Sequence, residues 1–294
     1  MKHYCTLLVF LLFSTTIFSQ STLQYKLKKG DVFHIKQDAE QVITQEMNGM
    51  SHEISNNMGG VFKFEITAIE NKNYHIKISF QDLTLKATSN LQGVVMNIEA
   101  KNVVEGDMQS NIFHSLLNVP ITAIMTPTGD ILEIKGADKL INKMMDGAGI
   151  EDSMTKEMMK KSLEKSYSST GLSNSFEQMT FIYPEAAVNI GDSWENSFSG
   201  DLQAKNTWTL KALSSSEATI EGEATIAMKT SEQGMTMELN GSQSYTLTTN
   251  AKNGFLKTLQ VKSTAKGDST IPQLGTTTIP TTLKSTTTYT LIQE

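Results

Sequence analysis

The sequence predicts a mainly β protein, in which curved antiparallel sheet carries a helical insert packed on it near the middle of the chain. Apolar and polar residues alternate through most of the chain, which is typical of half-buried strands. The connections between the alternating segments are short, so neighbouring strands are expected to pair antiparallel. Helical spacing is concentrated in the middle. One continuous sheet and two similar sheets are both compatible with this pattern.

The clearest strand signal is a hairpin in the first half of the chain. Phe62, Phe64 and Ile66 alternate with polar residues, and after a turn at 71–73 the alternation resumes over residues 74–80. This pattern indicates one apolar face and one solvated face. Further strands are predicted at residues 32–47, 83–88, 121–125, 131–135, 208–213, 218–228, 235–239, 245–249, 255–263 and 281–291.

Two helices are predicted in the middle of the chain. Asp138 is a candidate N-cap for apolar residues at 140–145, and Gly147 and Gly149 end that helix. A second helix over 153–167 places its apolar residues near one face and its lysines on the other.

The helical insert ends in a polar stretch, and a short helical turn is predicted before it in the chain. The stretch 166–175 is rich in serine and is expected to end the helices, and a short helical turn is predicted at 112–117. Because its segments are short and separated by glycines, the insert is expected to be the mobile part of the protein.

The order of features in the two β-rich parts suggests an internal duplication, with coincidence as the alternative. A Gly-Asp pair opens each part, at Gly30 and Gly191, and a tight turn follows later in each, at Gly129 and Gly254. The predicted organisation is a signal peptide (1–19), an N-terminal β-rich half (20–136), the helical insert (137–180) and a C-terminal β-rich half (181–294).

The first residues are typical of a secretory signal peptide. Lys2 precedes an apolar run at 7–13, and the small residue Ser19 places the expected cleavage before Gln20. We therefore expect an exported protein, periplasmic or extracellular, with no transmembrane segment in the mature chain. Cleavage would also remove Cys5, the only cysteine, so no disulfide or thiolate site is expected.

Charge and motifs argue against several functions. The 25 basic residues are all lysine and the net charge is −6, so bidentate arginine contacts to phosphate or guanine are impossible and no nucleic-acid partner is expected. His52-Glu53 begins a zinc-protease motif, but Asn56 replaces its second histidine. With no nucleophile elbow or nucleotide-binding glycine motif, we predict no enzyme activity, cofactor, catalytic residue or metal ligand.

Two acidic residues on one strand, Glu221 and Glu223, could in principle act as an acid and base pair. Such pairs are common on solvated strand faces. We therefore expect them to be surface residues.

Methionine is enriched, with 16 in the chain and six between residues 144 and 179. Its flexible thioether can fill irregular core space or adapt to a ligand. Packing of the helices on the sheet is one interpretation, and a ligand-facing lid is the other. The ligand-facing candidates are Met144, Met145, Met154, Met158 and Leu163.

The link between insert and second half carries a family resemblance. Phe181-Ile-Tyr183-Pro184, followed by Gly191-Asp192-Ser193-Trp194, resembles a motif that joins the two halves of uncharacterised secreted β-rich proteins of Bacteroidota. The resemblance implies the same plan of signal peptide, β-rich half, helical insert and second β-rich half. It brings no known activity, so no functional residue is carried over. The Gly-Asp-Ser-Trp stretch is interpreted as a structural turn, with a sugar or peptide contact as the alternative.

The leading hypothesis is a non-enzymatic exported cell-envelope protein that binds an apolar ligand or an envelope partner through the open face of its sheet. A sheet with one apolar side must bury that side, and a gap between helices and sheet would form an apolar cavity. The alternative is a structural or surface interaction module without a small ligand, favoured by the threonine-rich stretch 276–290, which suits an exposed strand. An enzyme built from residues distant in sequence is the third possibility.

Overall fold

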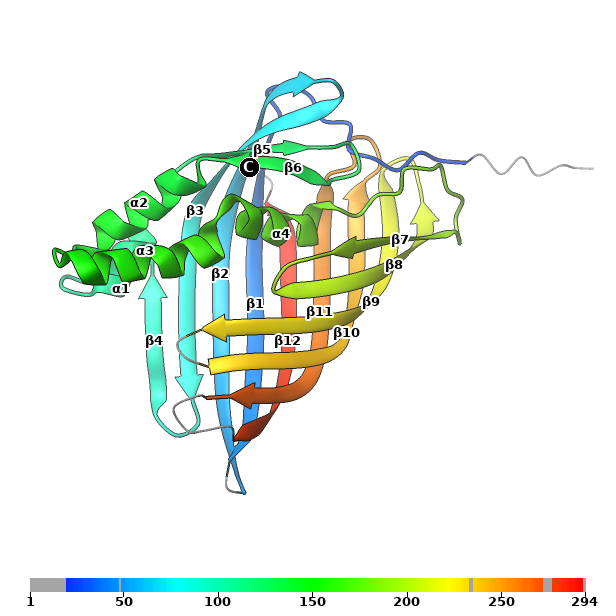
Figure 1. The fold of residues 1–294 in the computed structure, drawn as a ribbon. Coiled ribbons are helices and arrows are strands. Elements are labelled where there is room, and N and C mark those ends of the chain that lie inside the picture. The colour runs from blue at the N-terminus through cyan, green and yellow to red at the C-terminus, as the bar shows by residue number, and fades with distance from the viewer. Residues whose placement is uncertain (1–19, 48, 233–234, 272–276, 293–294) are drawn as a thin grey trace, which may run out of the picture.

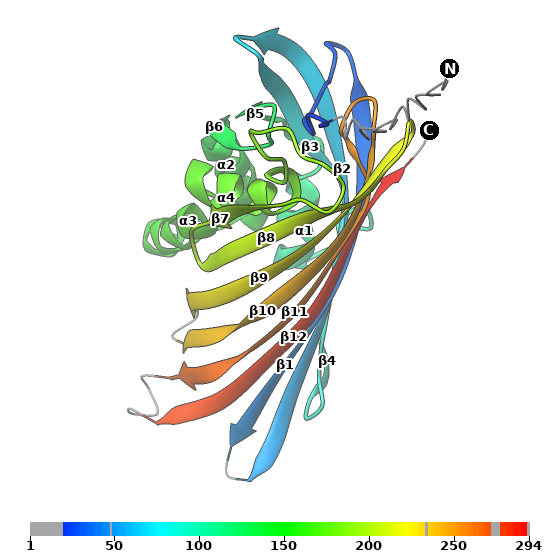
Figure 2. The ribbon, with the colours of Figure 1, turned by 90° about the vertical axis from the view of Figure 1, so that its right-hand side faces the viewer.

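The computed structural model describes residues 20–47, 49–232, 235–271 and 277–292, without the side chains of 165, 166 and 232. The predicted signal peptide and its cleavage site therefore lie outside these residues, apart from Gln20. The described chain forms one twelve-stranded antiparallel sheet with helices on one face, as Figures 1 and 2 show. This confirms a mainly β fold and a single continuous sheet.

The strands and helices have the following bounds. The strands are β1 (Val32–Met47), β2 (Met50–Glu70), β3 (Asn73–Ser89), β4 (Gly93–Glu99), β5 (Ile121–Met125), β6 (Ile131–Lys135), β7 (Ser193–Phe198), β8 (Leu202–Leu213), β9 (Glu217–Glu232), β10 (Met235–Asn250), β11 (Leu256–Thr270) and β12 (Thr278–Ile292). The helices are α1 (Met108–Ser115), α2 (Ala137–Ala148), α3 (Ser153–Tyr167) and α4 (Ser169–Thr180).

The first and last strands of the chain meet at the centre of the sheet. The strand order is β6-β5-β3-β2-β1-β12-β11-β10-β9-β8-β7, and β4 pairs with β3. β12 therefore lies between β1 and β11. The expectation that the threonine-rich stretch 276–290 forms an exposed strand is wrong for its described residues, because both edges of β12 are hydrogen-bonded.

The sheet curls strongly, so that strands distant in the sheet order contact each other. The Gln45 Nε2 atom on β1 lies 3.6 Å from the Met235 Sδ atom at the start of β10, although β12 and β11 stand between β1 and β10 in the sheet order. Glycines allow this curvature: a Cβ on Gly241 would lie 2.0 Å from the Thr264 carbonyl oxygen, and one on Gly267 equally close to the Glu238 carbonyl oxygen. The helices lie on the concave side that results (Figure 2).

Charge divides the two faces of the curled sheet. On β1 the odd-numbered residues from Phe33 to Met47 face the concave side and carry no charge, whereas Lys36, Asp38 and Glu40 face outward. The pairing registers extend this pattern to the strands from β7 to β12. Among the paired residues of these strands whose side chains the structure describes, no lysine, aspartate or glutamate occupies an inward position. Charged pairs such as Lys229 with Glu238 lie on the outer face.

Helix α4 spans the gap between the two edge strands, β6 and β7 (Figure 1). The Ser173 hydroxyl lies 3.3 Å from the Ile131 carbonyl oxygen of β6, and Asn196 of β7 donates to the Phe181 carbonyl oxygen just after α4. The expectation that the polar stretch 166–175 ends the helices is therefore wrong. Ser168 caps α4 by accepting a hydrogen bond from the Gly171 amide at 3.1 Å, and this cap starts a new helix.

The start of α2 also differs from the expectation. Its N-cap is Gly136, at φ 91°, rather than Asp138. Asp138 lies in the first turn, where a carboxylate interacts favourably with the helix dipole. The predicted turn at 112–117 is part of the longer helix α1, which Asp107 caps.

The two Gly-Asp pairs form the same turn. Asp31 accepts a hydrogen bond from the Lys28 amide, and Asp192 accepts one from the Asn189 amide, both at 2.7 Å. The amide of Gly191, which has φ 96°, donates a hydrogen bond to the Leu210 carbonyl oxygen. In the first turn the amide of Gly30 donates in the same way to the Ile66 carbonyl oxygen. The Gly-Asp-Ser-Trp stretch thus has a structural role; duplication of the two halves stays a prediction.

Candidate functional site

Two adjoining cavities lie between the concave face of the sheet and α4. Their volumes are about 380 Å³ and about 170 Å³, and both are bordered by Gln178 of α4 and Tyr289 of β12. Ordinary protein interiors contain few voids larger than a water molecule, whereas ligand pockets typically measure about 300–1,000 Å³. The volume of the larger cavity by itself lies within the range of a ligand site.

The larger cavity, here the aromatic chamber, has mostly apolar walls. The sheet contributes Phe62 and Phe80, whose ring centroids are 5.4 Å apart. Phe176 comes from α4, and its ring also packs edge-on against Phe64 with a centroid distance of 6.2 Å, which anchors the helix on the sheet. The remaining walls are Gln37, Tyr167, Leu172, Ser175 and Met179, with the shared Gln178 and Tyr289.

The smaller cavity, here the polar chamber, lies over a row of uncharged polar residues. In register across the concave face stand Asn56, Gln41, Ser285, Ser263, Gln243, Asn206 and Asn196, interrupted only by Ala224 on β9; we call them the polar row. Four members of the row line the chamber. The complete lining is Gln41, Gln178, Leu202, Met228, Gln243, Tyr245, Val261, Ser263, Leu283, Ser285, Thr287 and Tyr289.

The polar row is hydrogen-bonded at both ends. On one side Asn56 donates to Gln41 at 3.1 Å. On the other side Gln243 donates to the Ser263 hydroxyl at 2.8 Å, and Asn206 donates to Asn196 at 2.9 Å. The Tyr245 hydroxyl spans the interruption at β9, because it lies 2.9 Å from Asn206 Oδ1 and 2.7 Å from Gln243 Oε1, with one proton to share between them.

Polar groups at and beside the centre of the row have no hydrogen-bond partner among the described residues. The side chains of Ser285, Gln178 and Tyr289 make no hydrogen bond within the described part of the chain, although each borders the polar chamber. Burial raises the pKa of Tyr289 to about 12, so its hydroxyl stays protonated at physiological pH. These groups offer donors and acceptors to a molecule in the chambers.

Both chambers are free of formal charge. Among the residues whose side chains the structure describes, no lysine, aspartate, glutamate or histidine lines either one. The arrangement can therefore bind through apolar contact and neutral hydrogen bonds. Among the described lining residues, the titratable side chains are those of Tyr167, Tyr245 and Tyr289.

The candidates chosen from methionine content lie elsewhere. Met144 and Met145 on α2 are buried, while Met154 and Met158 on α3 are 74% and 68% exposed. Leu163 is partly buried and packs against the core. None of the five lines a chamber, and their contact with a ligand stays a prediction.

Residues that do line the chambers were missed for two reasons. Leu172, Phe176 and Met179 recur at spacings of four and three, a helical signal that the surrounding serines obscured. Gln41 and Ser285 stand at inward positions of strands, and only the register shows that they belong to one row.

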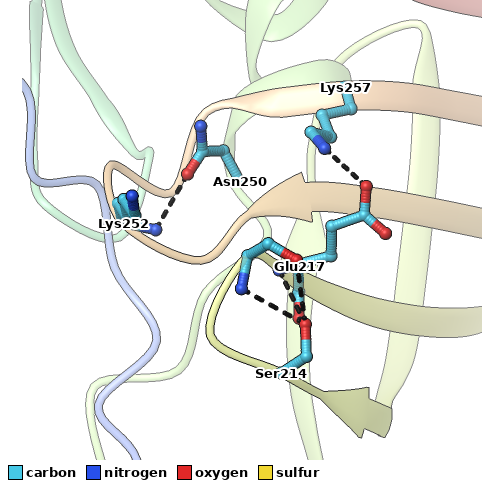
Figure 3. Close-up of polar contacts among 6 residues, drawn as sticks. Ser214, Glu217, Asn250, Lys252 and Lys257 are labelled. Carbon is cyan, nitrogen blue, oxygen red and sulfur yellow. Dashed lines mark hydrogen bonds and ion pairs between the residues drawn. The ribbon is translucent and has the colours of Figure 1, made fainter.

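A hollow of about 430 Å³ near the start of the described chain is a weaker candidate. As Figure 3 shows, its polar neighbours are engaged in turns: Ser214 accepts from the Glu217 amide at 3.0 Å, and Asn250 accepts from the Lys252 amide at 2.9 Å. Glu217 in turn pairs with Lys257. These contacts explain the residues as structural.

Other sites considered from the sequence have ordinary surroundings. Glu221 lies on the outer face and pairs with Lys211 at 3.3 Å. His52 contacts the Ser89 hydroxyl at 3.1 Å. In the described ranges, no group of three or more histidine, cysteine, aspartate or glutamate residues is arranged to hold a metal ion. The described helices include none that combines the length and apolarity required to cross a membrane.

The fold and its chambers define a curled, mainly β protein with partly open pockets between the sheet and α4. The sequence profile of DUF6263, a family of unknown function, matches residues 71–256, and the chain belongs to this family. No curated protein matches it.

A solved structure gives an informative likeness. A structure described for lipid–protein interactions in lipovitellin matches with a TM-score of 0.55 at 9% identity, covering 91% of this chain and 26% of that one. This chain thus spans about a quarter of the lipovitellin chain, and the likeness shows a shared fold. The translocator domain of the autotransporter NalP from Neisseria meningitidis has a TM-score of only 0.23 at 9% identity, covering 90% of this chain and 89% of that one. That score is too low to indicate a common fold.

Proposed function

We propose that this protein is a non-enzymatic, exported cell-envelope protein that binds one lipid-sized apolar or amphiphilic molecule in the chambers beneath α4. The observation that carries the proposal is a pair of adjoining cavities whose described linings contain no charged side chain. Export rests on the predicted signal peptide at residues 1–19.

The structure of the walls supports this function over simple packing. A core sheet would be expected to fill its concave side with aliphatic side chains. Here α4 covers the sheet yet leaves about 380 Å³ beside Phe62, Phe80 and Phe176. Burial of an acyl chain there would gain roughly 25 cal/mol per Å² of apolar surface removed from water. The likeness to lipovitellin, a protein with described lipid–protein interactions, agrees with this proposal.

The test is direct binding of an uncharged apolar fluorophore. Residues 20–294 would be purified, stripped of lipid and titrated with N-phenyl-1-naphthylamine, whose emission rises in apolar surroundings. Saturable binding of one fluorophore per chain is expected, and native mass spectrometry of protein isolated from the envelope should show a bound apolar molecule.

A matched pair of variants on α4 locates the binding. Ser175 lines the aromatic chamber, whereas Thr170 is exposed and lines neither chamber. Ser175→Trp should occupy the space and weaken fluorophore binding about tenfold or more, while Thr170→Trp should change it less than about twofold. Equal effects, or no saturable binding by the parent protein, would refute the proposal.

An interaction module without a small ligand is the second candidate. Its support is the exposure of Met154 and Met158 on α3, because large apolar side chains grouped on a surface often mark contact sites. Failure of all apolar molecules to bind, together with loss of an envelope partner on Met154→Ser and Met158→Ser substitution, would favour it.

A further inference from the structure

We infer that the ligand carries an uncharged hydrogen-bonding group, such as the hydroxyls of a monoacylglycerol, held by the centre of the polar row while its apolar tail lies in the aromatic chamber. This inference rests on the proposed function and specifies the class of ligand.

The described lining of the polar chamber lacks a counter-charge for an ionised headgroup. A carboxylate or phosphate transferred from water into the polar chamber would lose hydration worth several kcal/mol. No described lysine or histidine borders the chamber to compensate it. Nearby lysines face outward. Lys262 on β11 and Lys284 on β12, for example, occupy outward positions next to members of the row. A cationic group would equally find no described carboxylate.

Hydrogen-bonding groups that border the polar chamber have no partner within the described residues. Ser285 stands in register between Gln41 and Ser263, the points at which the hydrogen-bonded parts of the row end. Its hydroxyl makes no bond within the described residues. A pure hydrocarbon would leave this group unpaired, whereas a ligand hydroxyl or amide could both donate to it and accept from it.

The arrangement of the two chambers fixes the orientation of the ligand. Gln178 and Tyr289 stand where the two chambers meet, with the polar row on one side and three phenylalanines on the other. A molecule with one polar and one apolar end therefore matches the site in a single direction. The Tyr289 hydroxyl is a neutral donor and acceptor at physiological pH, so it can bond to the ligand's polar end.

The experiment compares three ligands with the same ten-carbon chain: monodecanoylglycerol, decanoate and decane. Each competes with N-phenyl-1-naphthylamine for the protein of residues 20–294, and isothermal titration calorimetry confirms the affinities. Monodecanoylglycerol is expected to bind about tenfold or more tightly than the other two. Decanoate should gain affinity below the pKa of its carboxyl group, where it becomes neutral.

Variants assign the effect to the polar row. Ser285→Ala and Tyr289→Phe should each weaken monodecanoylglycerol about fivefold, the loss of one net hydrogen bond, and leave decane unchanged. Thr286→Ala changes the outward neighbour of Ser285 and should alter neither ligand.

The outcomes separate this inference from the proposed function. If the fluorophore binds and all three ligands compete equally, or decanoate binds best in its charged form, the chambers bind apolar molecules but the neutral-headgroup inference is wrong. If the two variants leave monodecanoylglycerol unaffected, the polar row does not hold the headgroup and the inference also fails. If neither fluorophore nor ligand binds, the proposed function itself fails.

Discussion

The two faces of β1 carry different chemistry at adjacent positions. Inward residues such as Gln37 and Gln41 are polar but uncharged, while their outward neighbours Lys36, Asp38 and Glu40 are ionised. Burial of an unpaired charge costs far more than burial of an amide, which explains the absence of charge at the inward positions of β1. It does not explain why amides and hydroxyls stand there at all. The comparison indicates that the concave face is suited to a neutral, partly polar occupant rather than only to a dry core.

The largest expected difference is in stability and fluorophore binding, between a charge placed on the inward face of β12 and one placed on its outward face. Ser285 borders the polar chamber, whereas Thr286 stands outward between Glu40 and Lys262. Ser285→Lys should lower the free energy of unfolding by about 3 kcal/mol and abolish fluorophore binding, because its charge has no described partner. Thr286→Lys should change stability by about 0.5 kcal/mol or less. Urea unfolding and fluorophore titration check both; equal costs would show that the two faces are not electrostatically distinct.

The two faces also differ in shape, because the curled sheet is concave on one side and convex on the other. Glycine permits this curvature. Gly241→Ala places a Cβ against the Thr264 carbonyl oxygen, so stability should fall by about 2–3 kcal/mol as β10 and β11 are forced apart. Gly93→Ala is the control, because that glycine has φ 73° and open space around it, and only backbone strain of about 1 kcal/mol is expected. Thermal unfolding monitored by circular dichroism measures both. Similar costs would contradict the close approach of the two strands.

The cover of the concave face should be less stable than the face itself. Helices α2 to α4 are short and are interrupted at Gly149 and at Ser168, whereas the long central strands are hydrogen-bonded on both edges. Amide hydrogen exchange followed by mass spectrometry should therefore be faster over residues 137–180 than over β1 and β12. Added monodecanoylglycerol should slow exchange in α4 more than in α3, since α4 supplies most of the helical walls. Equal protection of helices and strands would show that the helices are part of the core.

The smallest effect is expected on the side of α4 that faces the β5–β6 turn. Burial, together with the charge of Asp130, raises the pKa of Glu177. Because the folded-state pKa lies above the unfolded one, the contribution of Glu177 is favourable at acidic pH and is lost as pH rises through the folded value. Glu177→Gln should therefore slightly raise the melting temperature at neutral pH, and the difference should vanish in acid. A destabilised variant at neutral pH would show that its hydrogen bond to Ser173 matters more.

The sequence by itself determined the fold class and the individual hairpins. Alternation around Phe62, Phe64 and Ile66 is a local property of a strand with one wet face, and the turn residues nearby are read over a few positions. It also indicated helices after residue 137, although the serine-rich sequence of α4 hid its helical spacing. Two strand segments that were predicted separately, 74–80 and 83–88, are one continuous strand with bulges. The family resemblance agrees with membership of an uncharacterised family.

Only the tertiary structure decided how these elements are combined. The pairing of β1 with β12 joins residues almost the whole chain apart, and no local pattern encodes that register. The polar row exists because the register aligns Gln41, Ser285 and Ser263 across three strands. The chambers likewise depend on the volume that α4 leaves above the sheet, and that volume is set by packing between distant segments. Sequence periodicity shows which side of a strand is buried; the pairing of strands and the position of the covering helix decide what that side encloses.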